Sequence, residues 1–380
     1  MKINDFALEV FFGKYEFTAP YLLAQSDCEA MTARELLAME EGSEQGYLDC
    51  WLGYTETWGA PELRRAIACL YRRMDEENVL VLHGAQEGIL AYMNVMLDAG
   101  DHAIIMYPNY PSAWEAVKAI PGCTFSEWKV KDDGEKWTID FDELEALIRP
   151  ETKLVAVNTP NNPTGYTFTN AELKRLCDIC EAHGLYLFCD EVYKGLELDG
   201  EAREAACDLY DKAVSVGVMS KAYGLAGLRV GWLASKDTET LEKVVRFKHY
   251  TSLCDSAPSE YLSVIALKHG DKLLERNKAI IRENLKTAEP FFKKYSHVFA
   301  QRPMTAGSVA FHRLTAEPDV EAFCLCAVEE KGVLLLPGSV YGVSEPYFRM
   351  GYGRKSFAEN LQKLDEYLTA SHMQGTTRGT

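Results

Sequence analysis

Short apolar runs alternate along the chain with longer segments in which apolar side chains recur every three or four positions. The apolar runs predict buried strands at 79–82, 102–106, 153–157, 185–189, 213–219 and 230–234. Helical periodicity separates most of these runs, and glycine or proline turns mark the boundaries. Strands that alternate with helices favour an α/β fold, with a mostly parallel sheet flanked by helices.

The C-terminal third has a different pattern. The segment 271–295 carries an apolar stripe at helical spacing and predicts one long helix. Short strands at 308–311, 333–336 and 347–350, with helices at 320–331 and 357–368, then predict a small α+β domain. Residues 1–45 predict two short helices and a connecting strand. We therefore expect a large domain at 46–268, a small domain from 1–45 and 269–371, and a disordered tail at 372–380.

Composition narrows the class of protein. The 380 residues are 47% hydrophobic and 26% charged, which is typical of a soluble globular protein. The net charge of −17, without a basic run, argues against binding to nucleic acid or to an anionic membrane. No apolar stretch is long enough to span a bilayer, and residues 1–5 lack the apolar core of a signal peptide, so we expect a cytoplasmic protein.

Eleven cysteines raise the question of a metal site. Cys177, Cys180 and His183 are spaced for one helix, but no second cluster completes a ligand shell. Several other cysteines lie inside apolar runs, where they behave as small buried side chains. We expect no metal.

Lys221 offers the first candidate chemistry. It lies between the run 213–219 and a glycine-containing turn, with Arg229 just before the next run. Because apolar surroundings favour the neutral amine, such a lysine can attack a carbonyl group and form a Schiff base. Ser220 and Arg229 suit a phosphate group. Taken alone, the segment is more typical of a solvated loop lysine.

Polar residues also follow the other predicted strands, at the edge where parallel sheets bind ligands. Gly84-Ala85-Gln86 opens a helix whose first amides can bind an anion. Asp190 ends an apolar run, and a buried aspartate needs a partner, although a capping or exposed position is equally consistent. Tyr110 and Asn162 lie in proline-containing turns, which are ordinary turns when considered singly.

Together these segments resemble the class I/II aminotransferases, which are pyridoxal 5′-phosphate (PLP) enzymes of fold type I. The resemblance rests on Ser220-Lys221 with Arg229, on Asn162-Pro163-Thr164-Gly165, and on the family order of motifs between 54 and 349. It implies that Lys221 holds PLP as a Schiff base and then acts as a general base. It also implies that Asp190 pairs with the pyridinium nitrogen, which makes the ring an electron sink.

The resemblance implies further roles. Tyr110 would stack on the pyridine ring, and Asn162 and Tyr193 would bond its phenolic oxygen. Arg349, with Asn162, would bind the substrate, the arginine clamping the α-carboxylate. The phosphate contacts would come from these residues: Gly84, Ala85, Gln86, Ser220, Arg229, and Tyr54 of the other subunit of a homodimer. Val218 departs from the serine or threonine that many relatives carry there, so one phosphate contact is missing.

The implied activity is transfer of an amino group from an L-amino acid to a 2-oxo acid. The same residues also support elimination, cyclisation or oxidation. The run 220–232, with 249–253 and 332–342, is similar to the capreomycidine-synthase type of PLP enzyme, which cyclises a hydroxyarginine. Asp5, Glu9 and Glu16 could face a basic substrate, but a solvated face is the favoured interpretation. A ligand sensor is disfavoured because no basic recognition helix is present.

Overall fold

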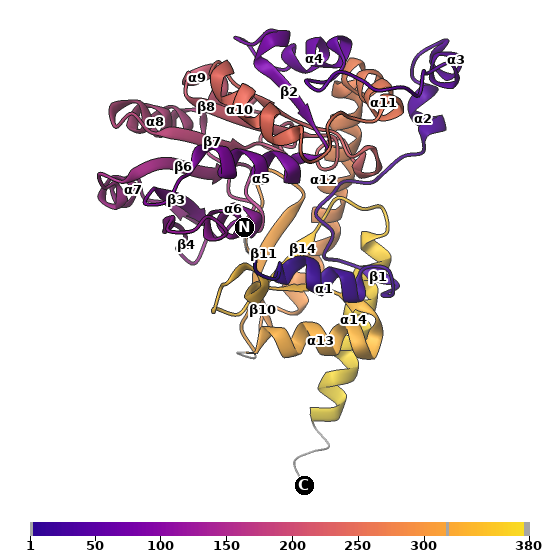
Figure 1. The fold of residues 1–380 in the computed structure, drawn as a ribbon. Coiled ribbons are helices and arrows are strands. Elements are labelled where there is room, and N and C mark those ends of the chain that lie inside the picture. Colours follow the sequence, from indigo (N-terminus) through magenta and orange to yellow (C-terminus); the bar gives the residue numbers. More distant parts are fainter. Residues whose placement is uncertain (1–2, 317–318, 376–380) are drawn as a thin grey trace.

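The structure, a computed structural model, describes residues 3–316 and 319–375. Figure 1 shows a layered α/β part above a smaller part, with the long helix α12 (Gly270–Lys294) running between them. None of the helices described combines the length and the apolar character needed to cross a bilayer.

The main sheet contains eight strands in the described residues, in the order β2-β9-β8-β7-β6-β3-β4-β5. The five strands from β8 to β4 are parallel, whereas β9 is antiparallel to both its neighbours and β5 is antiparallel to β4. The predicted α/β fold with a mostly parallel sheet is confirmed. The strands are β2 (Val79–Leu82), β9 (Gly231–Ala234), β8 (Ala213–Val218), β7 (Tyr186–Asp190), β6 (Thr152–Asn158), β3 (His102–Tyr107), β4 (Thr124–Asp132) and β5 (Trp137–Ile139).

Both faces of this sheet are buried. Successive residues of β6 alternate between two hydrophobic clusters, with Leu154 and Ala156 in one and Val155 and Val157 in the other. Continuous apolar strands are expected where helices cover both faces. The helices of this part are α4 (Pro61–Ala68), α5 (Ala85–Met96), α6 (Ser112–Lys118), α7 (Phe141–Leu147), α8 (Asn170–Ala182), α9 (Ala206–Leu209), α10 (Thr238–Lys248) and α11 (Ala257–Lys268).

The carboxyl ends of the parallel strands meet at one edge of the sheet. Asn158, the last residue of β6, is in register with Asp190, the last residue of β7. β8 ends beside them at Val218. Polar residues that are far apart in sequence are therefore neighbours at this edge, as expected for ligand binding in parallel sheets.

The smaller part contains an antiparallel sheet in the order β10-β11-β14-β13. Its strands are β10 (Phe299–Ala300), β11 (Val309–Leu314), β14 (Tyr347–Gly351) and β13 (Leu336–Pro337), with helices α13 (Val320–Lys331) and α14 (Phe357–Gly375). The strand predicted at 333–336 is divided. β12 (Val333–Leu334) pairs with β1 (Tyr21–Leu22) instead of joining this four-stranded sheet, whereas β13 does join it.

The N-terminal segment connects both parts. After α1 (Ala7–Tyr15) and β1, residues 23–28 form an extended segment that we call the strap. The amide of Cys28 donates to the carbonyl of Lys221 (3.4 Å), and the amide of Gly351 donates to that of Leu23 (2.7 Å). A Cβ atom at Gly351 would lie 1.8 Å from the carbonyl oxygen of Gln25, so only glycine permits this approach. The strap thus links β14 to the lysine loop.

The chain then continues into α2 (Ala33–Leu37) and α3 (Ser43–Leu48), which pack against α11; Tyr261 donates to the carbonyl of Ser43 at 3.0 Å. The division into 46–268 and 1–45 with 269–371 stays a prediction. At the other end, α14 reaches Gly375 and so enters the segment expected to be a disordered tail. Residues 376–380 of that segment lie outside the described residues.

Candidate active site

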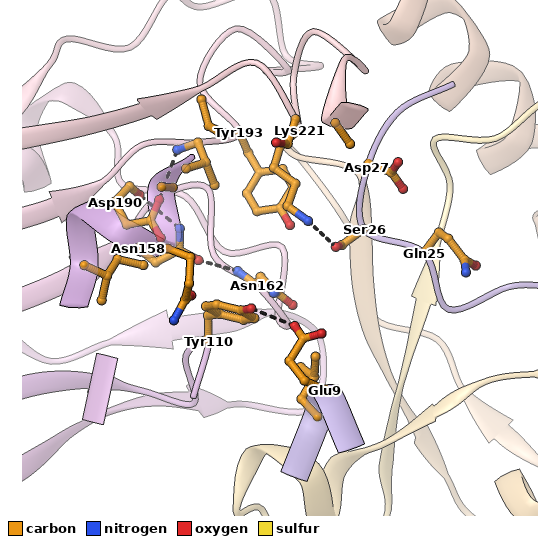
Figure 2. Close-up of a pocket in the computed structure, with 18 of the residues that line it drawn as sticks. Glu9, Gln25, Ser26, Asp27, Tyr110, Asn158, Asn162, Asp190, Tyr193 and Lys221 are labelled. Atoms are coloured by element: carbon orange, nitrogen blue, oxygen red, sulfur yellow. Dashed lines mark hydrogen bonds between the residues drawn. The ribbon is translucent and has the colours of Figure 1, made fainter. Parts of the chain in front are cut away.

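A cavity of about 290 Å³ opens at the carboxyl edge of the parallel strands, and α1 and the strap form its opposite wall. Figure 2 shows the side chains that converge there from both walls. The predicted site residues that line it are Ala85, Gln86, Tyr110, Asn162, Asp190, Tyr193, Ser220, Lys221, Arg229 and Arg349. Gly84 and Tyr54 do not line it. The structure therefore brings most of the predicted site together within one chain.

Lys221 lies in the loop after β8 and is half-buried. Its Nζ donates a 2.8 Å hydrogen bond to Oγ of Ser26 in the strap (Figure 2). Burial lowers the pKa of Lys221, Asp27 opposes this shift, and Arg349 adds to it. A lowered pKa increases the neutral fraction of the amine, which is the form that attacks carbonyl groups and accepts protons.

Asp190 ends β7 and is only 8% exposed. Burial raises the pKa of its carboxyl from 3.8 to about 7, because no ion-pair partner among the described residues compensates the charge. Its Oδ1 accepts a hydrogen bond from the backbone N–H of Val192 (3.2 Å). The side-chain Nδ2 of Asn158 donates to the backbone carbonyl of Asp190 (3.0 Å). A cation placed against this carboxylate would restore its ordinary acidity.

Two hydrogen-bond donors face the same space. The hydroxyl of Tyr193 is buried and has no hydrogen-bond partner in the described part of the chain. The oxygen of the Asn162 side chain accepts from Arg349 (3.1 Å) and from Tyr341 (2.8 Å), which leaves its amide nitrogen to donate into the cavity. A buried donor without a partner costs about 1–3 kcal/mol, so the Tyr193 hydroxyl in particular is suited to an acceptor atom of a ligand.

Arg349 on β14 is 1% exposed and forms no ion pair with any described acidic side chain. Its Nε and Nη2 donate to the carbonyl of Ala24 (3.1 and 2.5 Å), and Nη1 donates to the hydroxyl of Tyr341 (2.6 Å). A buried guanidinium without an acidic partner is costly. The cavity that it lines is therefore suited to a carboxylate.

A second anion site lies at the N-terminus of α5. Gly84 has φ of +85°, and a Cβ atom there would lie 2.7 Å from Nη2 of Arg229. A Cβ atom at Gly231 would lie 2.6 Å from the carbonyl carbon of Gly84. Arg229 itself has φ of 54°, an uncommon conformation for a residue with a side chain, and its Nη1 donates to Oγ of Ser220 at 3.3 Å. Helix amides, a hydroxyl and a guanidinium thus surround one small space, as phosphate binding requires.

Gln86 and Tyr110 complete the wall on the sheet side. Nε2 of Gln86 donates to Oγ of Ser112 at 2.8 Å. The hydroxyl of Tyr110 donates to Glu9 of α1 (2.8 Å), and its ring lies 5.2 Å from that of Phe6. These contacts fix the plane of an aromatic ring at the cavity, where it can stack on a flat ligand.

Tyr54 is 83% exposed and lies outside the cavity of its own chain. Leu48, Trp51 and Leu52, its neighbours in sequence, are also 70–80% exposed. The predicted contact between Tyr54 and phosphate is therefore not formed within one chain. This segment is instead an exposed apolar surface, of the kind that protein partners cover.

The residues of the cavity fit one composite ligand. The amine of Lys221 suits an aldehyde, Asp190 suits a ring nitrogen that carries a proton, and Tyr193 with Asn162 suits an oxygen acceptor. The Gly84–Arg229 cradle, which a Cβ atom would fill, suits a phosphate. Fold and site together define an α/β enzyme that uses a phosphorylated pyridine aldehyde.

Comparisons with known proteins lead to the same class. The chain belongs to the aminotransferase class I and II family, which its residues 23–368 match. Capreomycidine synthase of Streptomyces vinaceus is 28% identical over 324 residues, which are 85% of this chain and 82% of that protein.

Two solved structures superimpose closely. A PLP-dependent aminotransferase from Streptococcus suis has a TM-score of 0.89 at 28% identity, over 97% of this chain and 99% of that one. The PLP-dependent cyclase OrfR has a TM-score of 0.88 at 27% identity, over 98% of both chains. The fold is therefore that of the PLP enzymes of fold type I, and the cofactor is pyridoxal 5′-phosphate.

Several cavity residues were not predicted as site residues. Gln25, Ser26 and Asp27 of the strap carry no sequence signal, because they form neither an apolar run nor a turn motif. Tyr341 in η3 (Gly338–Tyr341) does not line the cavity but bonds Arg349 and Asn162, which do; it lies inside a run already noted for its similarity to a cyclising enzyme. Asn158 directly precedes the turn that contains Asn162. Its position at the end of a strand could have identified it as a site residue.

The acidic N-terminal residues differ from expectation. A solvated face was favoured for Asp5, Glu9 and Glu16; Asp5 and Glu9 are exposed, as expected, and Glu16 is half-buried, but Glu9 and Glu16 also line the cavity. Cys177 and Cys180 are buried in α8, where burial raises the pKa of the Cys177 thiol to about 12. Among the residues that the structure describes, no cluster of His, Cys, Asp and Glu could hold a metal ion.

Proposed function

We propose that the protein is a PLP-dependent aminotransferase that moves an amino group from an L-amino acid to a 2-oxo acid. One observation carries the proposal: the amine of Lys221 and the buried guanidinium of Arg349, which lacks an acidic partner, line the same cavity. An amino acid held by its α-carboxylate on Arg349 would present its α-carbon to this amine. The family supports the cofactor and the general chemistry.

Asp190, Lys221 and Arg349 would each have a separate role in the reaction. Bound PLP supplies an aldehyde and an electron-accepting ring. Asp190 holds a proton on the ring nitrogen, because a carboxylate there stabilises the protonated form. Lys221 can accept a proton from the α-carbon of the substrate and later donate it again, because its amine has a lowered pKa and a flexible four-carbon stem. Arg349 orients the substrate so that the transferred proton faces the amine.

A cyclase or lyase acting on a basic amino acid is the second candidate. The likeness to capreomycidine synthase and to the cyclase OrfR favours it, at identities similar to that of the aminotransferase structure. Such a reaction needs an acid that protonates a leaving group, and Glu9 and Glu16 in the cavity supply candidate acids. The two candidates share every residue that binds PLP, so only the products distinguish them.

The test is product analysis. Purified holoenzyme is mixed with each L-amino acid, with and without a 2-oxo acid acceptor, and products are identified by mass. A transaminase gives one equivalent of 2-oxo acid per site without the acceptor and many turnovers with it. Ammonia or a ring product that forms independently of the acceptor would replace transamination with the second candidate. The Lys221→Ala variant is the control for uncatalysed exchange.

We further propose a homodimer with shared active sites. Leu48, Trp51, Leu52 and Tyr54 leave an exposed apolar surface on the isolated chain, and association would remove it from water. Tyr54 of each chain would then reach the phosphate cradle of its partner. This arrangement would account for the 83% exposure of Tyr54 in the isolated chain.

A further inference from the structure

Three carboxylates line the cavity in addition to Asp190. Glu9 and Glu16 come from α1 and its C-terminal end, and Asp27 comes from the strap. They come from the wall opposite the sheet, and Figure 2 shows Glu9 beside Tyr110 and Asp27 next to Ser26 on the strap. None of them belongs to the PLP contacts derived above.

Two of the three have no cationic partner. Asp27 forms an ion pair with Arg354, in which its carboxylate lies 2.7 Å from Nη2. Glu9 accepts one hydrogen bond from Tyr110, and neither Glu9 nor Glu16 forms an ion pair in the described part of the chain. Burial raises the pKa of the Glu16 carboxyl; Asp27 and Glu9 add to this shift, whereas the neighbouring Gln25 and Lys221 oppose it. Glu9 and Glu16 are therefore acidic groups of this wall that have no ion-pair partner among the described residues.

Each cationic side chain that lines the cavity already has another role in the proposed function. Arg349 is directed to the α-carboxylate of a substrate, and Arg229 is directed to the phosphate. Lys221 must be neutral to react. Glu9 and Glu16 are thus available to bind a cationic group that belongs to the substrate.

An independent observation concerns Gln25 in the strap. This residue is 5% exposed and lines the same cavity; its side chain lies within reach of the Glu16 carboxyl, whose pKa it lowers, but neither its Nε2 nor its Oε1 has a partner at full hydrogen-bond geometry in the described residues. An amide buried without partners is costly, and most buried amides are satisfied. A polar ligand group beside the two carboxylates would satisfy it, with Oε1 accepting from a donor.

We propose that Glu9, Glu16 and Gln25 form a side-chain subsite for an L-amino acid with a cationic side chain, an ammonium or a guanidinium. This inference rests on the proposed function, because it assumes that an amino acid binds with its α-carboxylate on Arg349. A guanidinium carries five donors in a fixed plane, which two carboxylates and an amide oxygen match. Substrates with acidic side chains are excluded by repulsion from the same wall.

The experiment compares ligands of equal shape and different charge. Holoenzyme without an acceptor is titrated with L-arginine, L-citrulline, L-lysine and L-norleucine, and apparent dissociation constants are taken from the change in cofactor absorbance. We expect L-arginine to bind about tenfold or more tightly than L-citrulline, and L-lysine than L-norleucine, because hydrogen bonds between charged groups are the stronger ones. Glu16→Gln is expected to reduce each ratio about three- to tenfold, and the more exposed Glu9→Gln to reduce it less.

Asp5→Asn is the matched control, since it removes one negative charge from the same segment but outside the cavity. It should leave both ratios unchanged. Ratios measured within one protein also cancel any loss of folded enzyme.

Two outcomes overturn the inference in different ways. If L-citrulline binds as tightly as L-arginine, or if Glu16→Gln leaves the ratios unchanged, the subsite is wrong while the proposed function stands. If no amino acid changes the cofactor absorbance, the proposed function fails and the subsite fails with it.

Discussion

Arg349 donates a 2.6 Å hydrogen bond from Nη1 to the hydroxyl oxygen of Tyr341, and both side chains are buried. The same hydroxyl donates to Oδ1 of Asn162 at 2.8 Å. Tyr341 therefore holds the residue expected to bind the substrate carboxylate against the residue expected to bind the cofactor oxygen. It sets the orientation of both without facing a cofactor atom itself.

Removing this hydroxyl should loosen the carboxylate site. For Tyr341→Phe we expect KM for the amino acid to rise about three- to thirtyfold, with a smaller change in kcat, since one hydrogen bond to a charged group is lost. Steady-state kinetics check this. Tyr261→Phe, which removes a hydroxyl that bonds the carbonyl of Ser43 away from the cavity, should leave KM unchanged. A fall in kcat at constant KM would contradict the positioning role.

Asp190 makes the stability of the apoenzyme depend on pH. Burial raises the pKa of this carboxyl from 3.8 to about 7. Because the folded-state pKa is raised, its contribution is most favourable below about pH 4 and is lost progressively as the pH rises towards 7. Asp190→Asn should therefore stabilise the apoenzyme by about 2–4 kcal/mol at pH 8 and by almost nothing at pH 4.

Thermal unfolding of both apoproteins across this pH range is the measurement. The same variant should lose most of its activity, because a neutral amide cannot hold the ring proton. Equal stability of the two apoproteins at pH 8 would show that the carboxyl is not desolvated in the folded state.

Val218 lines the cavity with an apolar side chain, which offers no hydrogen bond to a phosphate. Val218→Thr should increase PLP affinity about three- to tenfold, since a hydroxyl can donate to the phosphate at nearly unchanged volume. The PLP-free form should become slightly less stable, because the added hydroxyl is then buried without a partner. PLP titration followed by absorbance measures the affinity, and Val216→Thr, on the same strand but outside the cavity, is the control. Weaker PLP binding by Val218→Thr would contradict the assignment of the phosphate cradle.

Tyr54 tests the shared active site. Tyr54→Phe should weaken PLP retention about three- to thirtyfold, because a hydrogen bond to a charged phosphate is removed across the interface. Leu52→Glu, which places a charge in the exposed apolar surface, should lower the sedimentation mass to that of one chain and reduce PLP retention with it. A monomer with full activity would exclude the dimeric arrangement.

The sequence predicted those site residues that lie at or just after the ends of strands. Asp190, Asn162 and Lys221 each follow an apolar run, and a parallel sheet brings such ends together whatever the strand order. The strand order itself was not predictable. β2 and β3 flank one helix in sequence but lie far apart in the sheet, because β9, β8, β7 and β6 lie between them.

The opposite wall of the cavity, formed by α1 and the strap, could not be predicted from local sequence patterns. The position of the strap depends on the approach of Gln25 to Gly351, two residues separated by most of the chain, and no periodicity encodes such a contact. The hairpin of β4 and β5 was also missed, because β4 is half polar and lies near the edge of the sheet, where alternation is weak. Glu9 and Glu16 resembled a solvated face since only the fold turns them towards Lys221.

Reductive trapping at Lys221 tests the account most directly. Holoenzyme is reduced with borohydride, digested and mapped by mass spectrometry, alongside a Lys221→Ala variant prepared with PLP in the same way. The account predicts that the pyridoxyl phosphate mass is found on the peptide that contains Lys221 and is absent from the variant. Modification at another lysine, or no adduct in a protein saturated with PLP, would contradict it.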